Sequence, residues 1–254
     1  MRNRNDVRRM SRIWRTGTKL GKSLGIVVFG ILLAAAGVRS APTTRQARVK
    51  QIQAAAAPVK SYGSSRAPIT MEVFSDYECP SCRNLFEQTL RPLINDYVAS
   101  GKVYLIHRDF PLPMHKYGYE AARWANAAAR AGEFSSVEAA LYDNQAAWSA
   151  DGNIAKYVAA AVPAADFKRI EKIMEGGCGY EPAGVKPAAL AVAPVAQSCA
   201  LDPYIEADRA LGMRIPVQST PTYVITYKGQ HLPPASGVVS WPILKQFFDS
   251  LLSQ

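Results

Sequence analysis

Cysteine and histidine are scarce in this chain of 254 residues, which contains four cysteines and three histidines. A structural zinc site usually takes four such ligands, arranged as closely spaced pairs. One closely spaced pair is present, Cys79 and Cys82, whereas Cys178 and Cys199 lie far from it and from each other. Glycine-rich phosphate-binding motifs are also missing, since neither GxGxxG after a strand nor GxxxxGK[ST] occurs. The sequence therefore predicts chemistry without a metal, nucleotide or flavin cofactor.

Acidic residues are almost absent from the first 50 residues, which carry 12 lysines and arginines and one acid, Asp6. The remaining 204 residues carry 18 basic and 19 acidic side chains. The net charge of +10 therefore belongs to the N-terminal segment, and the body of the protein is electrically balanced. Because nucleic-acid binding requires a basic surface on the folded body, we expect no nucleic-acid partner.

The apolar run at 24–38 covers only 15 residues. A full membrane span needs about 20 residues, whereas the apolar core of a signal peptide needs about 7–15. The run follows a long basic segment and precedes small residues, as in a secretory signal peptide. An uncleaved N-terminal anchor stays open, because the basic segment is unusually long. Both alternatives place the body outside the cytoplasm, in the periplasm or cell envelope.

We expect three divisions of the chain. Residues 1–40 form the signal peptide or anchor, and residues 41–66 form a flexible linker with little to bury. Residues 67–254 form the folded domain, for which we expect a monomer.

The folded domain is predicted to open with a strand, a helix and a second strand. β-Branched and aromatic residues predict the strands at 69–74 and 102–110, and apolar residues at helical spacing predict a helix at 79–100. Pro92 lies inside this helix and is expected to kink it. This order implies a parallel pair of strands with a right-handed crossover.

An alanine-rich helical block of about 111–215 separates this opening from the closing part of the domain. The predicted helical stretches, separated by glycine or proline, are 119–131, 135–148, 154–161, 165–174, 188–197 and 203–213. The closing part contains a strand at 222–227, a turn at Lys228-Gly229, a second short strand near Val238 and a helix at 243–252. The whole order predicts one α/β domain that carries an all-helical insertion.

The segment Cys79-Pro80-Ser81-Cys82 lies where the first strand has ended and the first helix begins. Free backbone N–H groups and the helix dipole favour a thiolate there, and the thiolate is the species that attacks disulfides. Pro80 fits an early helical position, and Ser81 is placed to donate a hydrogen bond to the Cys79 sulfur. We therefore predict that Cys79 forms the mixed disulfide with the substrate and that Cys82 resolves it.

Three other interpretations of the cysteine pair stay open. Zinc would need more ligands, of which His107, His115 and the distant Cys178 are the nearest candidates. The pair could also be a static disulfide in a strained loop, or two plain buried thiols. Asp76 and Glu78 beside the cysteine pair could tune proton transfer, although solvated loop acids are the leading interpretation. His115 is expected to be a surface histidine without a partner.

A second proline, Pro221, directly precedes the predicted strand at 222–227. Proline is tolerated at the first residue of a strand, which by itself explains this position.

Together with this proline, three separate segments resemble the DsbA-like thiol–disulfide oxidoreductases over roughly residues 67–254. They are FSDYECPSC, RDFPLP followed by EAARWANAA, and STPTYVI. The resemblance implies a thioredoxin-like fold with a helical insertion. It also implies that Thr220 and Pro221 form a cis-proline loop, packed against the active-site disulfide, whose backbone pairs with an extended substrate peptide. Pro80-Ser81 stands where the strongly oxidising members have Pro-His, which argues for weaker oxidising power.

Cys178 and Cys199 both fall in the helical block. An even number of cysteines in an exported protein favours pairing, and a disulfide here would stabilise the fold by ~3 kcal/mol. A structural disulfide is the leading interpretation. A second redox pair and two free buried thiols are the alternatives.

These patterns predict an exported thiol–disulfide oxidoreductase that acts on cysteine-containing exported polypeptides, as an oxidase that introduces disulfides. A membrane or soluble redox partner would reset the cysteine pair. A disulfide reductase or isomerase is the alternative within the same chemistry. A non-enzymatic binding module or a metal chaperone of the same fold is the alternative from another class.

Overall fold

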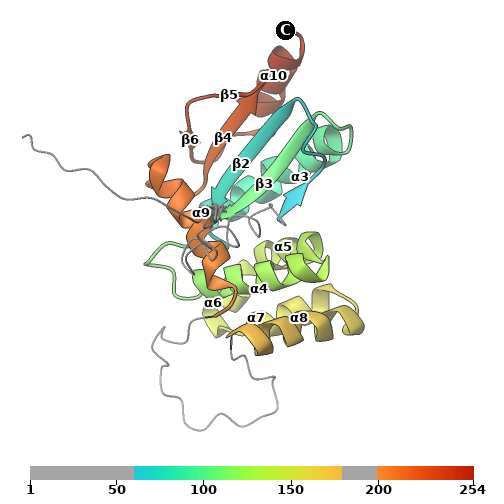
Figure 1. Cartoon of the computed structure of the whole chain (residues 1–254), viewed down its shortest axis with the longest axis vertical. Helices are drawn as coiled ribbons and strands as arrows, with labels where there is room; N and C mark the ends of the chain where they lie inside the picture. Colours follow the sequence, from blue (N-terminus) through green and yellow to red (C-terminus); the bar gives the residue numbers. More distant parts are fainter. Residues whose placement is uncertain (1–59, 179–198) are drawn as a thin grey trace, which may run out of the picture. The chain divides into compact units, whose positions relative to one another are not determined.

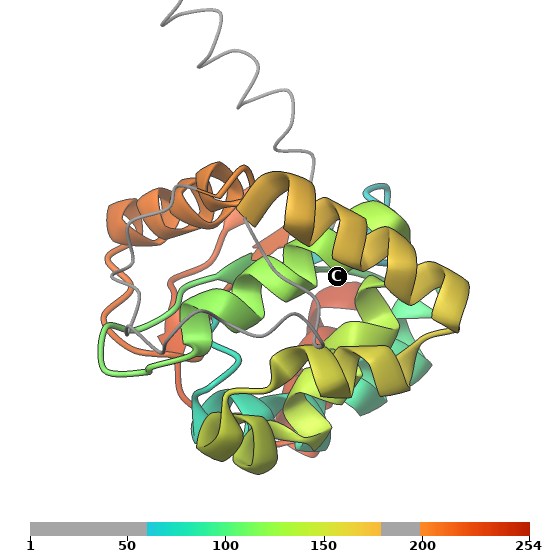
Figure 2. The same ribbon diagram turned by 90° about the horizontal axis from the view of Figure 1, so that it is seen from below.

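The computed structural model describes residues 60–178 and 199–254, and Figures 1 and 2 show their arrangement. The predicted signal peptide or anchor at 1–40 and the predicted helix at 188–197 lie outside these residues. Across the two described stretches, no helix is long and apolar enough to cross a membrane.

A mixed sheet forms the centre of the described part of the chain. Its strands are β1 (Ser61–Tyr62), β2 (Ile69–Ser75), β3 (Val103–Asp109), β4 (Thr222–Tyr227), β5 (Gln230–His231) and β6 (Ala235–Ser236). The strand order is β1-β3-β2-β4-β5, and β6 also pairs with β4. As predicted, β2 and β3 are parallel, whereas β4 runs antiparallel to β2.

In the central strand β2, buried apolar residues first alternate with half-buried polar ones, and from Val73 to Ser75 every residue is buried. Ile69, Met71 and Val73 point into the main hydrophobic core. Phe74 points to the other face, where a smaller cluster also contains Phe110, Val217 and Val224. Burial on both faces holds the end of β2, and therefore the loop that follows it, in a defined position.

The predicted helix at 79–100 is present but is not regular. It consists of α2 (Pro80–Leu85), the π-helical turn η1 (Phe86–Leu90), α3 (Arg91–Leu93) and the π-helical turn η2 (Ile94–Val98). Pro92 lies in α3, so the irregularity expected at this proline takes the form of π-helical turns on both sides of it.

The helical insertion lies beyond the carboxyl ends of β2 and β3 and covers this end of the sheet (Figures 1 and 2). The remaining helices are α4 (Gly118–Ala131), α5 (Phe134–Asp143), α6 (Gln145–Asp151), α7 (Ile154–Ala161), α8 (Ala164–Cys178), α9 (Asp202–Arg214) and α10 (Trp241–Leu252). α9 packs against β3, and α10 packs against η1 and α3. The insertion therefore faces the point where α2 begins.

The single helix predicted at 135–148 is wrong, because α5 ends and α6 begins at Asn144. The Asn144 backbone is not helical, and its side-chain amide donates a hydrogen bond of 2.9 Å to the carbonyl oxygen of Ala140. Asparagine competes in this way with the helical backbone, and apolar periodicity does not reveal the break.

The predicted linker at 41–66 extends too far. Ser61 and Tyr62 pair with β3, and the Lys60 side chain is buried against Asp109 and Asp208. The segment looked like a linker because its polar composition does not reveal that these side chains have buried partners. The folded domain therefore includes residues 60–66, while residues 41–59 lie outside the described part.

The closing hairpin turns at Lys228 and Gly229, as predicted. Both residues have positive φ, +48° and +78°, which suits a two-residue turn between antiparallel strands. The short strand predicted near Val238 is found at Ala235–Ser236, and Val238 itself is exposed.

Candidate active site

Cys79 and Cys82 lie at the start of α2, directly after the loop that leaves β2. Cys79 is the N-cap residue and Pro80 occupies the first turn, as the sequence predicts. Both cysteines are free thiols in this structure. Cys79 is 7% exposed and Cys82 is 1% exposed, so an incoming sulfur would reach Cys79 first.

The surroundings of the two sulfurs shift their acidities in opposite directions. The pKa of Cys79 is lowered to about 5, chiefly by a hydrogen bond from the Cys82 thiol, while burial opposes this shift. Thr220 and the backbone N–H groups of Ser81 and Cys82 lower it further. The pKa of Cys82 is raised well above 9, chiefly by burial. Cys79 is therefore the thiolate of the pair, and Cys82 keeps its proton.

Ser81 contributes to this site through its backbone. Its N–H group helps to lower the pKa of Cys79, whereas its side chain is exposed. The predicted hydrogen bond from the Ser81 hydroxyl stays a prediction.

The loop before β4 lies against Cys79. The Thr220–Pro221 peptide bond is cis, and the carbonyl oxygen of Thr220 lies 3.4 Å from the Cys79 sulfur. The Thr222 hydroxyl holds this loop by donating to the carbonyl oxygen of Ser219 at 2.7 Å. The structure thus brings together two segments that are separated by the whole helical insertion.

Asp76 is buried beside the cysteines, so the expectation of a solvated loop acid is wrong for this residue. It is 1% exposed, and its carboxylate accepts hydrogen bonds from the backbone N–H groups of Glu78 and Leu112 at 2.8 and 2.7 Å. Its Oδ2 atom also lies 2.7 Å from Nδ1 of His115. His115 therefore has a partner, contrary to prediction, because the parallel pairing of β2 and β3 carries the loop after β3 back to the loop after β2.

The reactive loop is the segment 76–79, which joins β2 to α2 and ends in Cys79. Two further contacts hold the loop after β3 against it. The Glu78 carboxylate accepts a hydrogen bond of 2.5 Å from the backbone N–H of Tyr117. At Gly118 a Cβ atom would lie 2.6 Å from Oδ1 of Asp76, so only glycine allows this close approach.

Sequence reasoning missed Gln145, which connects the helical insertion to the reactive loop. It is 5% exposed, and its amide nitrogen donates hydrogen bonds to the carbonyl oxygens of Tyr77 and Cys79 at 2.6 and 3.0 Å. A glutamine in an alanine-rich helix carries no sequence signal of such a role.

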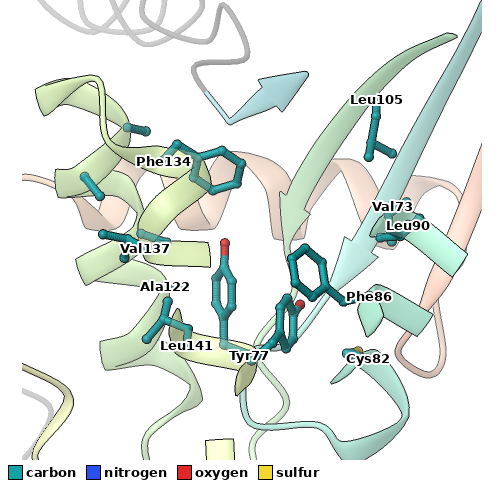
Figure 3. Close-up of a cluster of buried hydrophobic side chains, with 14 of the residues drawn as sticks. Val73, Tyr77, Cys82, Phe86, Leu90, Leu105, Ala122, Phe134, Val137 and Leu141 are labelled. Carbon is teal, nitrogen blue, oxygen red and sulfur yellow. The ribbon is translucent and has the colours of Figure 1, made fainter. Parts of the chain in front are cut away.

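Aromatic side chains close the inner side of the site (Figure 3). The ring of Tyr142 lies 4.7 Å from that of Phe86 and 5.2 Å from that of Tyr77. Figure 3 shows Cys82 at the edge of this cluster. The apolar surroundings explain why Cys82 disfavours the thiolate form.

The candidate zinc ligands have other partners. Nδ1 of His107 lies 2.8 Å from a carboxylate oxygen of Glu138, and His115 pairs with Asp76. Cys178 is bonded to Cys199. Within residues 60–178 and 199–254, no three histidine, cysteine or acidic side chains are grouped so that they could hold a metal ion.

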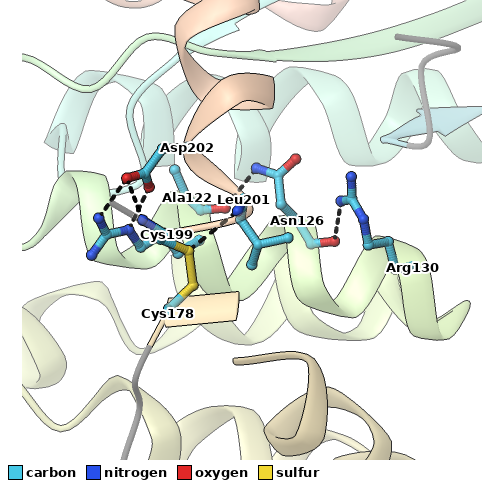
Figure 4. The surroundings of a disulfide bond; sticks show 8 residues. Ala122, Asn126, Arg130, Cys178, Cys199, Leu201 and Asp202 are labelled. Atoms are coloured by element: carbon cyan, nitrogen blue, oxygen red, sulfur yellow. Dashed lines mark hydrogen bonds and ion pairs between the residues drawn. A yellow bond between two sulfur atoms is a disulfide. The ribbon is translucent and has the colours of Figure 1, made fainter. Parts of the chain in front are cut away.

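The Cys178–Cys199 disulfide joins the end of α8 to the segment before α9 (Figure 4). Cys199 is 2% exposed, and its backbone N–H donates to Asp202 at 2.9 Å. Asp202 in turn pairs with Arg123 of α4 at 2.7 Å. The disulfide thus belongs to a buried connection between helices, in keeping with the structural interpretation.

A groove of about 640 Å³ opens beside His115. The loop after β3 forms one side of it and helices α4 and α9 form the other; its lining residues are Pro111, Leu112, Pro113, His115, Lys116, Tyr119, Arg123, Asp202, Glu206 and Arg209. Met114, next to this groove in sequence, is 76% exposed.

A family model and several solved structures are similar to this chain. A family model described as thioredoxin matches residues 57–231. The structure of α-DsbA1 from Wolbachia pipientis is 17% identical, with a TM-score of 0.55 over 76% of this chain and 90% of that one. BdbD from Bacillus subtilis, in its oxidised form, is also 17% identical, with a TM-score of 0.52 over 77% and 93% of the two chains. The predicted thioredoxin-like α/β fold with a helical insertion is thereby confirmed.

A curated relative matches a shorter part of the chain. The Na(+)/H(+) antiporter NhaA 3 of Salinispora tropica is 36% identical over 84 residues, which is 33% of this chain. The chain spans 12% of the length of that antiporter, so the match concerns a small part of the larger protein.

Proposed function

Because the chain belongs to the thioredoxin family and has the fold of the DsbA-type oxidoreductases, we propose that it exchanges disulfides with proteins through Cys79 and Cys82. The observation that carries this proposal is the contrast between the two sulfurs. Cys79 is the more accessible sulfur and has a pKa of about 5, whereas Cys82 is buried and stays protonated. A pair with one thiolate and one thiol has the asymmetry that stepwise exchange requires.

We propose an oxidase that introduces disulfides into its substrates. With the Cys79–Cys82 disulfide formed, a substrate thiolate attacks the Cys79 sulfur, the bond to Cys82 breaks, and Cys82 takes up a proton. A second substrate thiolate then attacks the substrate sulfur of the mixed disulfide and releases Cys79 as a thiolate. The substrate loses two electrons and the cysteine pair gains them.

The acidity of Cys79 supports this direction of transfer. A thiol of low pKa leaves readily, and stabilisation of its thiolate favours the reduced form of the pair, which makes the disulfide form oxidising. The absence of a histidine from Pro80-Ser81 argues for a weaker oxidant. A reductase is therefore the alternative, and the reduction potential of the Cys79–Cys82 couple must exclude it.

The substrates we propose are cysteine-containing exported polypeptides that bind in extended form along Thr220 and Pro221. The contact between Thr220 and Cys79 supports this, since a peptide paired with that backbone would lie next to the reactive sulfur. A membrane or soluble redox partner then resets the pair. Export through the apolar run at 24–38 and action as a monomer are part of the same proposal.

The reduction potential of the cysteine pair tests this function. The full chain and its Cys79→Ser variant are equilibrated with glutathione, and both are assayed for reduction of insulin disulfides. A Cys79-dependent potential between about −120 and −230 mV supports an oxidase, and one near −270 mV or below identifies a reductant. If the full chain shows no exchange, the oxidoreductase proposal fails; a binding module would keep its partner affinity in Cys79→Ser.

A further inference from the structure

His115 and Asp76 form a pair beside the reactive cysteines that the exchange chemistry above does not use. Nδ1 of His115 lies 2.7 Å from Oδ2 of Asp76. The Asp76 side chain is 0% exposed and that of His115 is 20% exposed. One member of the pair is therefore sealed inside the protein, while the other faces the groove next to the site.

The backbone of Asp76 contacts both cysteines. Its N–H donates a hydrogen bond of 3.4 Å to the Cys82 sulfur, and its carbonyl oxygen accepts one of 3.1 Å from the N–H of Cys79. Asp76 therefore lies in the same tight turn as Cys79, and its main chain contacts the Cys82 sulfur directly. An uncompensated carboxylate at this position would oppose formation of the Cys79 thiolate, because like charges repel in a buried site.

His115 is placed to compensate that carboxylate. Burial alone would lower the pKa of His115, but the hydrogen bond and charge of Asp76, together with the charges of Cys79 and Glu78, raise it. Coupling between two groups is reciprocal. If the Cys79 thiolate favours the imidazolium form of His115, the imidazolium favours the Cys79 thiolate to the same extent.

The other charged groups around His115 largely cancel. Glu78 acts on His115 from the reactive loop, and the titratable residues that line the groove together with His115 are Lys116, Tyr119, which is neutral, Arg123, Asp202, Glu206 and Arg209. Arg123 is paired with Asp202, and Arg209 with Glu206. Lys116 is fully exposed, so water screens its charge.

Resting on the proposed function, we propose that His115 is a positioning residue of the exchange site, whose imidazolium, held by Asp76, stabilises the Cys79 thiolate from outside the CxxC segment. Pro80 and Ser81 carry no charge, and the helix N-terminus alone supplies only partial charges. In this proposal the imidazolium of His115 adds one whole positive charge to the partial charges of the helix N-terminus.

The test replaces His115 by glutamine, which can still donate a hydrogen bond to Asp76 but cannot be charged. Two quantities are measured on the full chain: the pKa of Cys79, from the ultraviolet absorbance of its thiolate, and the equilibrium constant for reduction of the Cys79–Cys82 disulfide by glutathione. In His115→Gln the pKa of Cys79 should rise, and at neutral pH the equilibrium constant should fall by about tenfold for each pKa unit. The difference in the equilibrium constant should vanish at pH values where wild-type His115 is neutral.

Two variants serve as controls. His231 is exposed on β5 and bonds to Thr226, so His231→Gln makes the same chemical change at another site and should leave both quantities unchanged. His115→Lys retains a positive charge and should keep both quantities closer to wild type than His115→Gln does. His115→Asn is the second neutral variant if His115→Gln does not fold.

The proposal is overturned if His115→Gln behaves like His231→Gln, or if His115→Lys shifts both quantities as far as His115→Gln. Failure of the proposed function is a separate result. If wild-type protein exchanges no disulfide with glutathione, the function fails, while the thiolate titration still decides the role of His115.

Discussion

Gln145, the first residue of α6, donates a hydrogen bond of 3.0 Å to the carbonyl oxygen of Cys79. A second hydrogen bond, of 2.6 Å, runs from the same amide nitrogen to the carbonyl oxygen of Tyr77. The helical insertion therefore holds the reactive loop directly, and its contribution to the site is geometric rather than chemical.

Replacing Gln145 by leucine should destabilise the protein and slow exchange. The carbonyl oxygen of Tyr77 would lose its side-chain donor in a buried place, which costs about 1–3 kcal/mol of the free energy of unfolding. Urea unfolding and the rate of insulin reduction measure the two effects. Gln230→Leu, at an exposed position of β5, is the matched control. Equal behaviour of the two variants would show that Gln145 does not support the reactive loop.

The reactivity of Cys79 should depend on pH with a midpoint near the value of about 5 to which its pKa is lowered. Alkylation by iodoacetamide should level off above this pH and fall about tenfold per unit below it, because only the thiolate reacts. Cys79→Ser removes the reactive sulfur and should show no such titration. A midpoint near 8 or 9 would contradict the assignment of Cys79 as the thiolate.

The same shift predicts how the stability of the reduced protein depends on pH. Since the folded-state pKa of Cys79 is depressed, the thiolate stabilises the reduced fold above the unfolded-state pKa of about 8.5. This contribution should decline as the pH falls and be lost once the pH has passed through about 5. Unfolding of reduced wild type and reduced Cys79→Ser should therefore differ most at alkaline pH and converge in acid.

Lys60→Met should strongly destabilise the fold. Lys60 is 5% exposed and pairs with Asp109 and, at 3.1 Å, with Asp208. Asp208 would keep its pairing with Arg108, but the buried Asp109 would lose its counter-charge. Breaking a buried ion pair by removing one partner costs about 3–5 kcal/mol.

Lys172→Met, on the exposed side of α8, is the matched control for this change. Urea unfolding at neutral pH compares the two variants. If Lys60→Met lowers the free energy of unfolding no more than Lys172→Met does, the segment at 60–66 is not an integral part of the domain.

The Cys178–Cys199 disulfide should stabilise the protein without taking part in exchange. It closes a loop with a sequence separation of 21 residues, for which the chain-entropy model gives about 3 kcal/mol. In a Cys79→Ser/Cys82→Ser background, a reducing agent should lower the unfolding midpoint as much as Cys178→Ala/Cys199→Ala does. Loss of exchange in a Cys178→Ala/Cys199→Ala variant that keeps Cys79 and Cys82 and is still folded would instead support a second redox pair.

Much of the fold can be predicted from local patterns. The strand at 222–227 and the helix at 154–161 have the predicted bounds, because side-chain periodicity and flanking glycine or proline act over a few residues. The same holds for the position of Cys79 and Cys82 at a helix start, which depends only on the strand before them and the helix after them.

Prediction is least successful where a polar residue has a partner far away in the chain. Local sequence places Lys60 in a linker and His115 at the surface, and it carries no signal for the role of Gln145. Their partners Asp109, Asp76 and Cys79 lie tens of residues away in sequence.

Local sequence therefore determines where the two cysteines of the proposed exchange site lie: one helical turn apart, at a helix N-terminus that favours a thiolate. Tertiary structure alone decides which charges and hydrogen bonds surround them. The physical reason is that a helix or strand depends on residues a few positions apart. The burial of Asp76, its pairing with His115 and the contact of Gln145 with Cys79 depend instead on which distant segments the sheet and the helical insertion bring together.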